Sequence, residues 1–201
     1  GVQALSVGQR VLVSSRDLAQ RGGCYAQSIV VPQSAPYPLP DSISHQDAVS
    51  LPNLQLALAL IQAACLMPSE EQRSVLITGA AGGVATMLSQ LAKLHGFQTI
   101  GTARSEDKRR FALANGFDVV LDSVPETLTA QVMQATQRRG VNLVYDHLGS
   151  AYLTACMRSL SAMGLAISYN IITGKPVADN LLALLAAHRI NSFFAPPSIW
   201  I

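Results

Sequence analysis

The glycine-rich segment at residues 78–85, TGAAGGVA, has the residue types and spacing of a phosphate-binding turn. It follows a short apolar run and leads into residues 83–95, where apolar side chains recur at helical spacing. A turn from a strand into a helix presents backbone N–H groups at the helix N-terminus, where the helix dipole favours an anion. Residues without bulky side chains let phosphate groups approach that backbone. The segment therefore predicts a site for the pyrophosphate of a dinucleotide.

The strict dinucleotide-binding pattern, Gly-x-Gly-x-x-Gly, is met only in part. Its three glycine positions hold Ala80, Gly82 and Ala85. Alanine is compatible with the third position, which requires only close packing of the helix on the strand. An ordinary tight turn between a strand and a helix is the alternative interpretation.

A basic cluster lies about twenty residues beyond the glycines, where an NAD-binding site has an acid for the ribose 2′-hydroxyl. This sequence has Arg104 and Ser105 there, and no acid at the strand end. Four of the fourteen Lys and Arg residues lie in this short stretch: Arg104, Lys108, Arg109 and Arg110. Such side chains bind a 2′-phosphate, and the Ser105 hydroxyl adds a donor. We therefore predict NADP(H) rather than NAD(H), with a solvated first helical turn as the alternative.

The elements that position these residues alternate between strand and helix patterns from residue 74 onward. The expected strands are 74–78, 99–103, 119–121, 143–145, 165–169 and 191–195. The expected helices are 83–95, 105–115, 126–138, a helix after Ser150, and 179–188. This alternation predicts an α/β Rossmann fold, a doubly wound parallel six-stranded sheet with helices on both faces.

The first 43 residues follow a different pattern. Residues 10–13 and 25–31 are expected to be short strands, and four prolines between residues 32 and 40 predict a linker. A capping sequence at Ser44 and Asp47 predicts the start of a helix. The expected domains are therefore residues 1–43, a β-rich piece with its linker, and residues 44–201, the dinucleotide-binding domain.

Composition excludes several classes of protein. The chain is 49% hydrophobic and 13% charged, which excludes intrinsic disorder, and its net charge of +2 gives no general case for nucleic acid.

Residues 48–69 lack charges but contain several polar side chains, so we expect a buried helix rather than a membrane span. Three widely spaced cysteines predict reduced thiols in a cytoplasmic protein: Cys24, Cys65 and Cys156.

The histidines suggest no metal site, because none has a cysteine or an acid at ligand spacing. His147 follows Asp146 at the expected end of a strand, where it would face the cofactor crevice. A capping or solvated histidine is the alternative interpretation. The short-chain dehydrogenase type is excluded, because no tyrosine has a lysine four residues later. No catalytic residue is identified.

Five segments, taken in order, resemble the zinc-free medium-chain dehydrogenase/reductases. They are VGQRV at 7–11, GGCYA at 22–26, VLITGAAGGV at 75–84, QLAKLHG at 90–96 and VYDHLG at 144–149. The most similar members are the NADPH:quinone oxidoreductases of the zeta-crystallin type and the enoyl reductase domains of polyketide synthases. The sequence departs from the family pattern at Ala57, Ala85 and Asn170, where the family has Thr, Gly and Gly.

The resemblance implies NADP(H) as cofactor and hydride transfer to a small molecule, either a quinone or an α,β-unsaturated carbonyl. An enoyl reductase domain of a polyketide or fatty acid synthase and a non-catalytic dinucleotide-binding module are the alternatives. The resemblance also implies that the chain is a fragment, with a partial β-rich, GroES-like catalytic domain before the Rossmann domain. A homodimer through the edge strand near Ser192–Ala195 is expected. The implied cofactor-binding residues are Ala81, Gly82, Gly83, Val84, Arg104, Ser105, Lys108, Leu148, Tyr169, Asn170 and Ile171.

Overall fold

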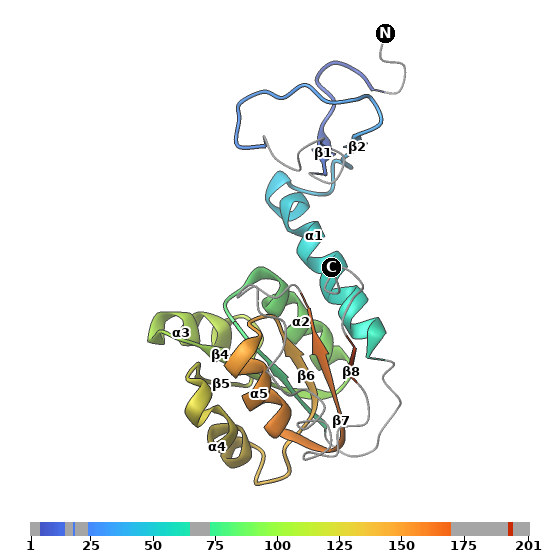
Figure 1. Cartoon of the computed structure of the whole chain (residues 1–201). Helices are drawn as coiled ribbons and strands as arrows, with labels where there is room; N and C mark the ends of the chain where they lie inside the picture. Colours follow the sequence, from blue (N-terminus) through green and yellow to red (C-terminus); the bar gives the residue numbers. More distant parts are fainter. Residues whose placement is uncertain (1–4, 15–17, 19–23, 65–72, 170–192, 195–201) are drawn as a thin grey trace. The chain divides into compact units, whose positions relative to one another are not determined.

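The computed structural model describes residues 5–14, 18, 24–64, 73–169 and 193–194 (Figure 1). The chain divides into two compact units, residues 1–52 and residues 53–201. Each unit is described by itself below.

The first unit contains a small antiparallel sheet. Strand β1 (Val11–Val13) pairs with β2 (Pro36–Pro38), and Leu12 lies opposite Tyr37. The prediction of a strand at 25–31 was wrong, because residues 24–30 are exposed and form bends and irregular backbone. Part of the expected proline linker pairs instead. Proline lacks an N–H group to donate, and a two-stranded sheet tolerates it because both strands have a free edge.

Helix α1 (His45–Ala63) begins where the capping sequence predicts. The Ser44 hydroxyl oxygen accepts the Asp47 backbone N–H at 3.0 Å. From residue 53 onward the helix belongs to the second unit, and one of its faces is buried there. The buried positions recur at helical spacing and are Ala57, Leu60 and Ile61, with buried Ala64 just after the helix. No helix in the described part of the chain is long and apolar enough to cross a membrane.

The second unit is built on a parallel sheet of six strands. The strands are β3 (Arg73–Ile77), β4 (Phe97–Ala103), β5 (Val119–Asp122), β6 (Val141–Asp146), β7 (Leu160–Ser168) and β8 (Phe193–Phe194). They lie in the order β5-β4-β3-β6-β7-β8, and every pair is parallel. This is the strand order of the Rossmann fold, so the predicted fold class is confirmed. The chain order reverses between the neighbours β3 and β6.

One helix follows each of the strands β3, β4, β5 and β6 along the chain. These helices are α2 (Gly83–Leu94), α3 (Glu106–Ala114), α4 (Pro125–Ala135) and α5 (Ser150–Arg158). Helix α4 ends earlier than expected, because Gln137 and Arg138 adopt left-handed backbone with φ of 51° and 65°. Of the last expected elements, helix 179–188 lies outside the described residues, and strand 191–195 is described only as β8.

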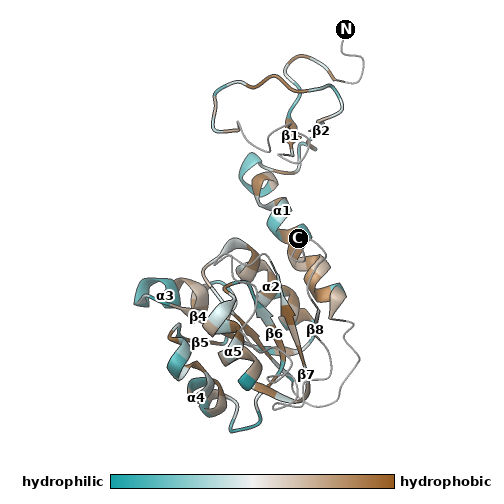
Figure 2. Ribbon diagram, viewed as in Figure 1, coloured by the Kyte–Doolittle hydropathy of each residue, from teal (hydrophilic) through white to brown (hydrophobic). Residues whose placement is uncertain are grey.

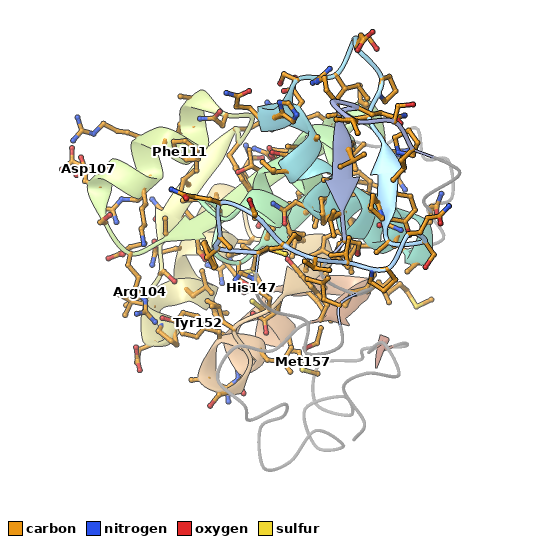
Figure 3. The ribbon with its side chains drawn as sticks, turned by 90° about the horizontal axis from the view of Figure 1, so that it is seen from above. Arg104, Asp107, Phe111, His147, Tyr152 and Met157 are labelled. Atoms are coloured by element: carbon orange, nitrogen blue, oxygen red, sulfur yellow. The ribbon has the colours of Figure 1, made fainter. Side chains whose placement is uncertain are left out.

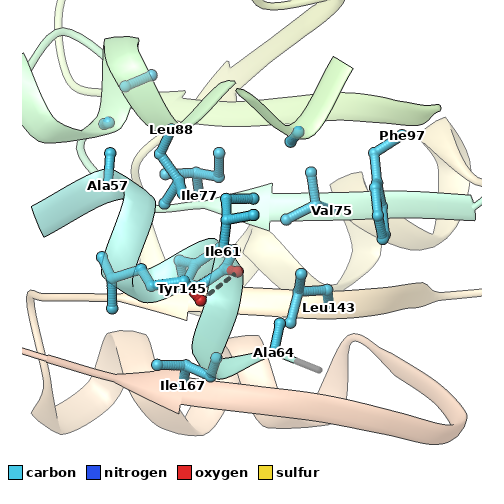
Figure 4. Packing of buried hydrophobic residues seen from close by; sticks show 14 of the residues in the cluster. Ala57, Ile61, Ala64, Val75, Ile77, Leu88, Phe97, Leu143, Tyr145 and Ile167 are labelled. Atoms are coloured by element: carbon cyan, nitrogen blue, oxygen red, sulfur yellow. Dashed lines mark hydrogen bonds between the residues drawn. The ribbon is translucent and has the colours of Figure 1, made fainter. Parts of the chain in front are cut away.

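The core lies on both faces of this sheet. Val75 and Ile77 of β3 join the cluster that contains residues of α1 and α2, whereas Leu76 joins the cluster under α4 and α5. Figure 4 shows the first of these clusters, where side chains from α1 and α2 meet the central strands. Figure 2 shows apolar strands beside a hydrophilic first half of α3. A sheet covered on both faces explains the low charge content of the sequence.

Candidate functional site

Two loops meet at the point where the strand order reverses. Residues 78–82 connect β3 to α2, and residues 147–149 connect β6 to α5. Because β3 and β6 are parallel neighbours, both loops leave the same edge of the sheet. Ligands of open α/β sheets bind in the crevice at this position, beyond the carboxyl ends of the strands. Leu148, which the resemblance implies as a cofactor-binding residue, lies on the second of these loops.

The glycine-rich turn is fixed by strand β4. The Ala80 N–H donates to the Thr102 carbonyl oxygen at 2.8 Å, and the Gly79 N–H donates to the Thr102 hydroxyl at 3.2 Å. Gly79 has a φ of +66°, a conformation that favours glycine. The Gly82 N–H then closes the turn on the Gly79 carbonyl oxygen at 2.9 Å. These bonds determine the angle at which α2 begins.

The N-terminus of α2 has no side-chain cap. Its N-cap residue is Gly82, and Gly82 and Gly83 are both exposed. The first N–H groups of a helix have no intrahelical acceptor, so they are available to a ligand here. A side chain at Gly83 would lie 2.5 Å from the Asn53 amide nitrogen of α1, so a larger residue there would require the Asn53 side chain to move. Together with Ala81 and Val84 this surface has the geometry and dipole that fit a pyrophosphate.

A buried carboxylate ties the two loops together. Asp146 is fully buried, and its carboxylate accepts from the Thr78 hydroxyl at 2.9 Å, the Leu148 N–H at 3.2 Å and the Gly149 N–H at 2.8 Å. Burial raises the pKa of Asp146, and the three donors act in the opposite direction. The network was not predicted from the sequence. The sequence signal that could have predicted it is Thr78, a hydroxyl residue before the glycines, together with Asp146, an acid at the end of the neighbouring strand.

His147 lies across the glycine-rich turn. A side chain at Gly79 would overlap with the imidazole Cε1 atom, so the ring occupies the space above this glycine. The Nδ1 atom lies 3.3 Å from the Thr78 hydroxyl oxygen. Burial lowers the pKa of His147, while the nearby Asp146 charge raises it. The crevice position expected for His147 is therefore observed, as a partly exposed side chain.

Tyr169 lies behind His147 rather than in the open crevice. Its side chain is buried, with ring centroids 5.7 Å apart from the imidazole. Burial raises the pKa of Tyr169, and the Asp146 charge adds to this. Asn170 and Ile171, the other two residues expected in this segment, lie outside the described residues.

The basic cluster after β4 divides into paired and unpaired side chains. Arg109 binds the Asp122 carboxylate at 3.2 Å, and Arg110 binds that of Asp107 at 2.6 Å. Arg104 and Lys108 are exposed and form no ion pair with any described residue. In Figure 3, Arg104 lies near α3 and His147 lies closer to the middle of the sheet.

Ser105 is the N-cap of α3, and its hydroxyl oxygen accepts the Lys108 N–H at 3.4 Å. This contact holds the first turn of the helix beside the end of β4. The residues expected at the 2′-phosphate, Arg104, Ser105 and Lys108, therefore share one exposed helix start.

The family of the chain follows from its comparison with family models. The model described as zinc-binding dehydrogenase matches residues 83–195, more than half of the chain. The chain belongs to this family. Among residues 5–14, 18, 24–64, 73–169 and 193–194, no group of three or more His, Cys, Asp or Glu side chains is placed to hold a metal ion.

Several curated relatives of the chain are named quinone oxidoreductase. The protein from Rattus norvegicus is 29% identical over 169 residues, 83% of this chain and 49% of its own length. The Salmonella typhimurium protein is 31% identical over 183 residues, 90% of this chain and 54% of its own length. A highly reducing polyketide synthase of Purpureocillium lilacinum is 30% identical over 172 residues, 83% of this chain and 6% of that protein. The chain spans about half the length of the curated quinone oxidoreductases it matches.

Solved structures support the same family assignment. Quinone oxidoreductase of Pseudomonas syringae has a TM-score of 0.67 and 28% identity, covering 82% of this chain and 50% of that one. A mycobacterial protein complexed with NADPH has a TM-score of 0.69 and 27% identity, covering 85% of this chain and 52% of that one. The resemblance to medium-chain dehydrogenase/reductases of the quinone oxidoreductase and enoyl reductase type is confirmed.

Proposed function

We propose that this chain is the cofactor-binding part of an NADPH-dependent reductase that acts on a quinone or an α,β-unsaturated carbonyl. One observation carries the choice of cofactor: Arg104 and Lys108 are exposed and without an ion-pair partner among the described residues. They lie beyond β4, the neighbour of the strand that enters the glycine-rich turn. A mycobacterial relative complexed with NADPH and relatives named quinone oxidoreductase support the proposal.

Each part of the site has a defined role in this proposal. The N–H groups of α2 at Gly83 and Val84 bind the pyrophosphate, and Ala81 and Gly82 leave room for it. Arg104 and Lys108 bind the 2′-phosphate, with Ser105 holding the start of α3. Bound NADPH supplies the hydride, and the protein orients the nicotinamide and keeps water away from it. Leu148 is placed on the ribose and nicotinamide side of the cofactor.

The test is a titration of the chain with NADPH and NADH, followed by an assay of NADPH oxidation by the full-length protein with a quinone and with an enone. We expect NADPH to bind, and to bind more tightly than NADH. Absence of NADPH binding would refute the proposal. Binding without turnover of either acceptor would favour the alternative, a non-catalytic dinucleotide-binding module.

The fungal polyketide synthase relative favours a second candidate function, an enoyl reductase domain of a larger synthase. The two candidates differ in the electron acceptor. An enoyl thioester reduced faster than a quinone would favour the synthase domain, and the reverse order would favour the quinone oxidoreductase.

We also propose that the protein forms a homodimer through its edge strand. In the described sheet, β8 (Phe193–Phe194) is the last strand in the order, and such an edge can pair with a second copy. Sedimentation at several concentrations tests this, with a monomer at all concentrations as the contradicting result. The cytoplasmic location and the domain boundary after residue 43 stay predictions.

A further inference from the structure

The imidazole of His147 has one nitrogen engaged by the protein and one that is not. Nδ1 lies 3.3 Å from the Thr78 hydroxyl oxygen. Nε2 has no hydrogen-bond partner among the described residues, although the ring lies directly over Gly79 in the glycine-rich turn. The side chain is partly exposed, at the edge of the crevice between the two loops.

The hydrogen bonds around Thr78 determine which nitrogen carries the proton. A hydroxyl group has one hydrogen to donate. Thr78 donates it to the Asp146 carboxylate at 2.9 Å, and its oxygen also accepts the His147 backbone N–H at 3.2 Å. All three groups around that carboxyl are donors, an arrangement that favours its ionised form. The Thr78 oxygen can therefore only accept in its contact with His147, and that contact requires a hydrogen on Nδ1.

A neutral imidazole with its hydrogen on Nδ1 has a lone pair on Nε2. The hydrogen bond between Nδ1 and Thr78 thus sets the tautomer of the ring, because the bond made by one ring nitrogen determines the state of the other. The site accordingly offers a side-chain acceptor beside the N–H donors of a helix N-terminus. A ligand that matches it carries a phosphate and, next to the phosphate, a hydroxyl group.

We propose that His147 is a nucleotide-binding residue whose neutral Nε2 accepts a hydrogen bond from a hydroxyl of the nucleotide bound at the glycine-rich turn. In a dinucleotide, the ribose hydroxyls are the donors closest to the pyrophosphate. The inference rests on the proposed function, because it requires NADPH to bind at this turn.

Protonation of His147 removes the acceptor, so NADPH affinity decreases as the pH falls through the pKa of the imidazole. The titratable groups that face the ring among the described residues are Asp146 and Tyr169, and the glycine-rich turn contributes none. Burial lowers the pKa of His147, so the neutral form is present at pH 7. A cationic His147 that bound phosphate would produce the opposite pH dependence.

Two substitutions distinguish the contributions of Nδ1 and Nε2 of His147 to NADPH binding. In His147→Gln the side-chain amide reaches the Nε2 position and can still present an oxygen, whereas in His147→Asn it reaches only the Nδ1 position. We expect His147→Asn to weaken NADPH binding about three- to tenfold, the effect of one neutral hydrogen bond, and His147→Gln to stay within about twofold of the wild type. His95→Gln, at the far end of α2, is the matched control and should not change binding.

Titrations of NADPH from pH 8 to pH 5, with thermal unfolding of each variant, complete the experiment. The 2′-phosphate of NADPH also titrates in this pH range, and it affects the wild type and His147→Gln equally. The difference in pH dependence between these two proteins is therefore attributed to His147. Nitrogen NMR of the imidazole should show the hydrogen on Nδ1, with His147→Gln identifying the signal.

Three results would overturn the inference while leaving the proposed function intact: equal affinities in both variants, tighter wild-type binding at low pH, or a hydrogen on Nε2. Absence of NADPH binding to the wild type would instead remove the proposed function and this inference with it.

Discussion

The hydroxyl group of Tyr145 on β6 donates a hydrogen bond to the carbonyl oxygen of Leu60 on α1, with 3.0 Å between the two oxygens (Figure 4). Tyr145 is fully buried, and burial raises the pKa of its phenol, with buried Tyr169 adding to this. The bond ties the last turns of α1 to a central strand of the sheet. It therefore fixes one side of the cluster in which α1, α2 and the sheet meet.

The variant Tyr145→Phe should lower the free energy of unfolding by about 1 kcal/mol, measured by urea denaturation. The loss stays near that value because the Leu60 oxygen also accepts the Ala64 N–H at 3.3 Å. Tyr152→Phe is the matched control, since its hydroxyl donates to the Ser123 carbonyl oxygen at 3.1 Å in a partly exposed position. A larger loss for Tyr152→Phe than for Tyr145→Phe would contradict this account.

Gly79→Ala should destabilise the protein more than Gly96→Ala. Both glycines have positive φ, so each alanine costs about 1–2 kcal/mol in backbone strain. The space beside Gly96 is open, whereas the new methyl group at position 79 would meet the His147 ring. The excess for Gly79→Ala, measured by chemical denaturation, should disappear in the background of His147→Ala. An excess that persists in the double variant would show that the ring is not its cause.

Replacement of Arg104 and Lys108 by alanine together should weaken NADPH binding tenfold or more, on the order of 1.5–3 kcal/mol for a lost bond to a charged group. NADH binding should change by less than about twofold, because NADH lacks the 2′-phosphate. Arg110→Ala is the control, since its guanidinium is paired with Asp107 and Glu106. Equal losses for the two nucleotides would refute the 2′-phosphate assignment.

Asp118→Asn should remove a stabilising contribution that depends on pH. Burial raises the pKa of Asp118, but hydrogen bonds from Lys93 and Thr99 and the Lys93 charge outweigh burial and hold it below 3.8. The Lys93 ammonium lies 2.8 Å from the carboxylate. A carboxylate with a lowered pKa stabilises the fold above its ordinary pKa and loses that effect as the pH falls through the folded value.

The measurement for Asp118 is urea unfolding of the wild type and Asp118→Asn at pH 7 and at several values below pH 4. The difference in stability should be present at pH 7 and shrink as the pH falls below 3.8. A difference that is constant over this range would mean that the charge of Asp118 contributes nothing.

The Rossmann unit was largely predictable, because its signals are local. The glycine-rich turn and the apolar strands can be recognised from short stretches of sequence, as can the helix start at Ser44 that precedes this unit. The strand order then follows from general rules for crossover connections. The expected strand at 25–31 failed because a strand also needs a partner, and those residues are exposed.

The candidate site was predictable in its composition and not in its contacts. The four basic residues after β4 were recognisable as a group, but their pairing depends on Asp122 from β5 and on Asp107 one helical turn away. Likewise, the contact between Asn53 and Gly83 joins α1 to α2 across a long sequence separation. Contacts of this kind depend on side-chain geometry between elements, which spacing along one element does not encode.

The basic side chains between Arg104 and Arg110 differ in whether they form ion pairs, and this difference determines how coenzyme preference can change. Arg109 joins α3 to the end of β5, and Arg110 neutralises the acids at the start of the helix. The two residues proposed to meet the 2′-phosphate share neither of these tasks. Substitutions at Arg104 and Lys108 can therefore alter the choice of coenzyme while the fold stays intact, which makes this preference open to selection and to engineering independently of stability.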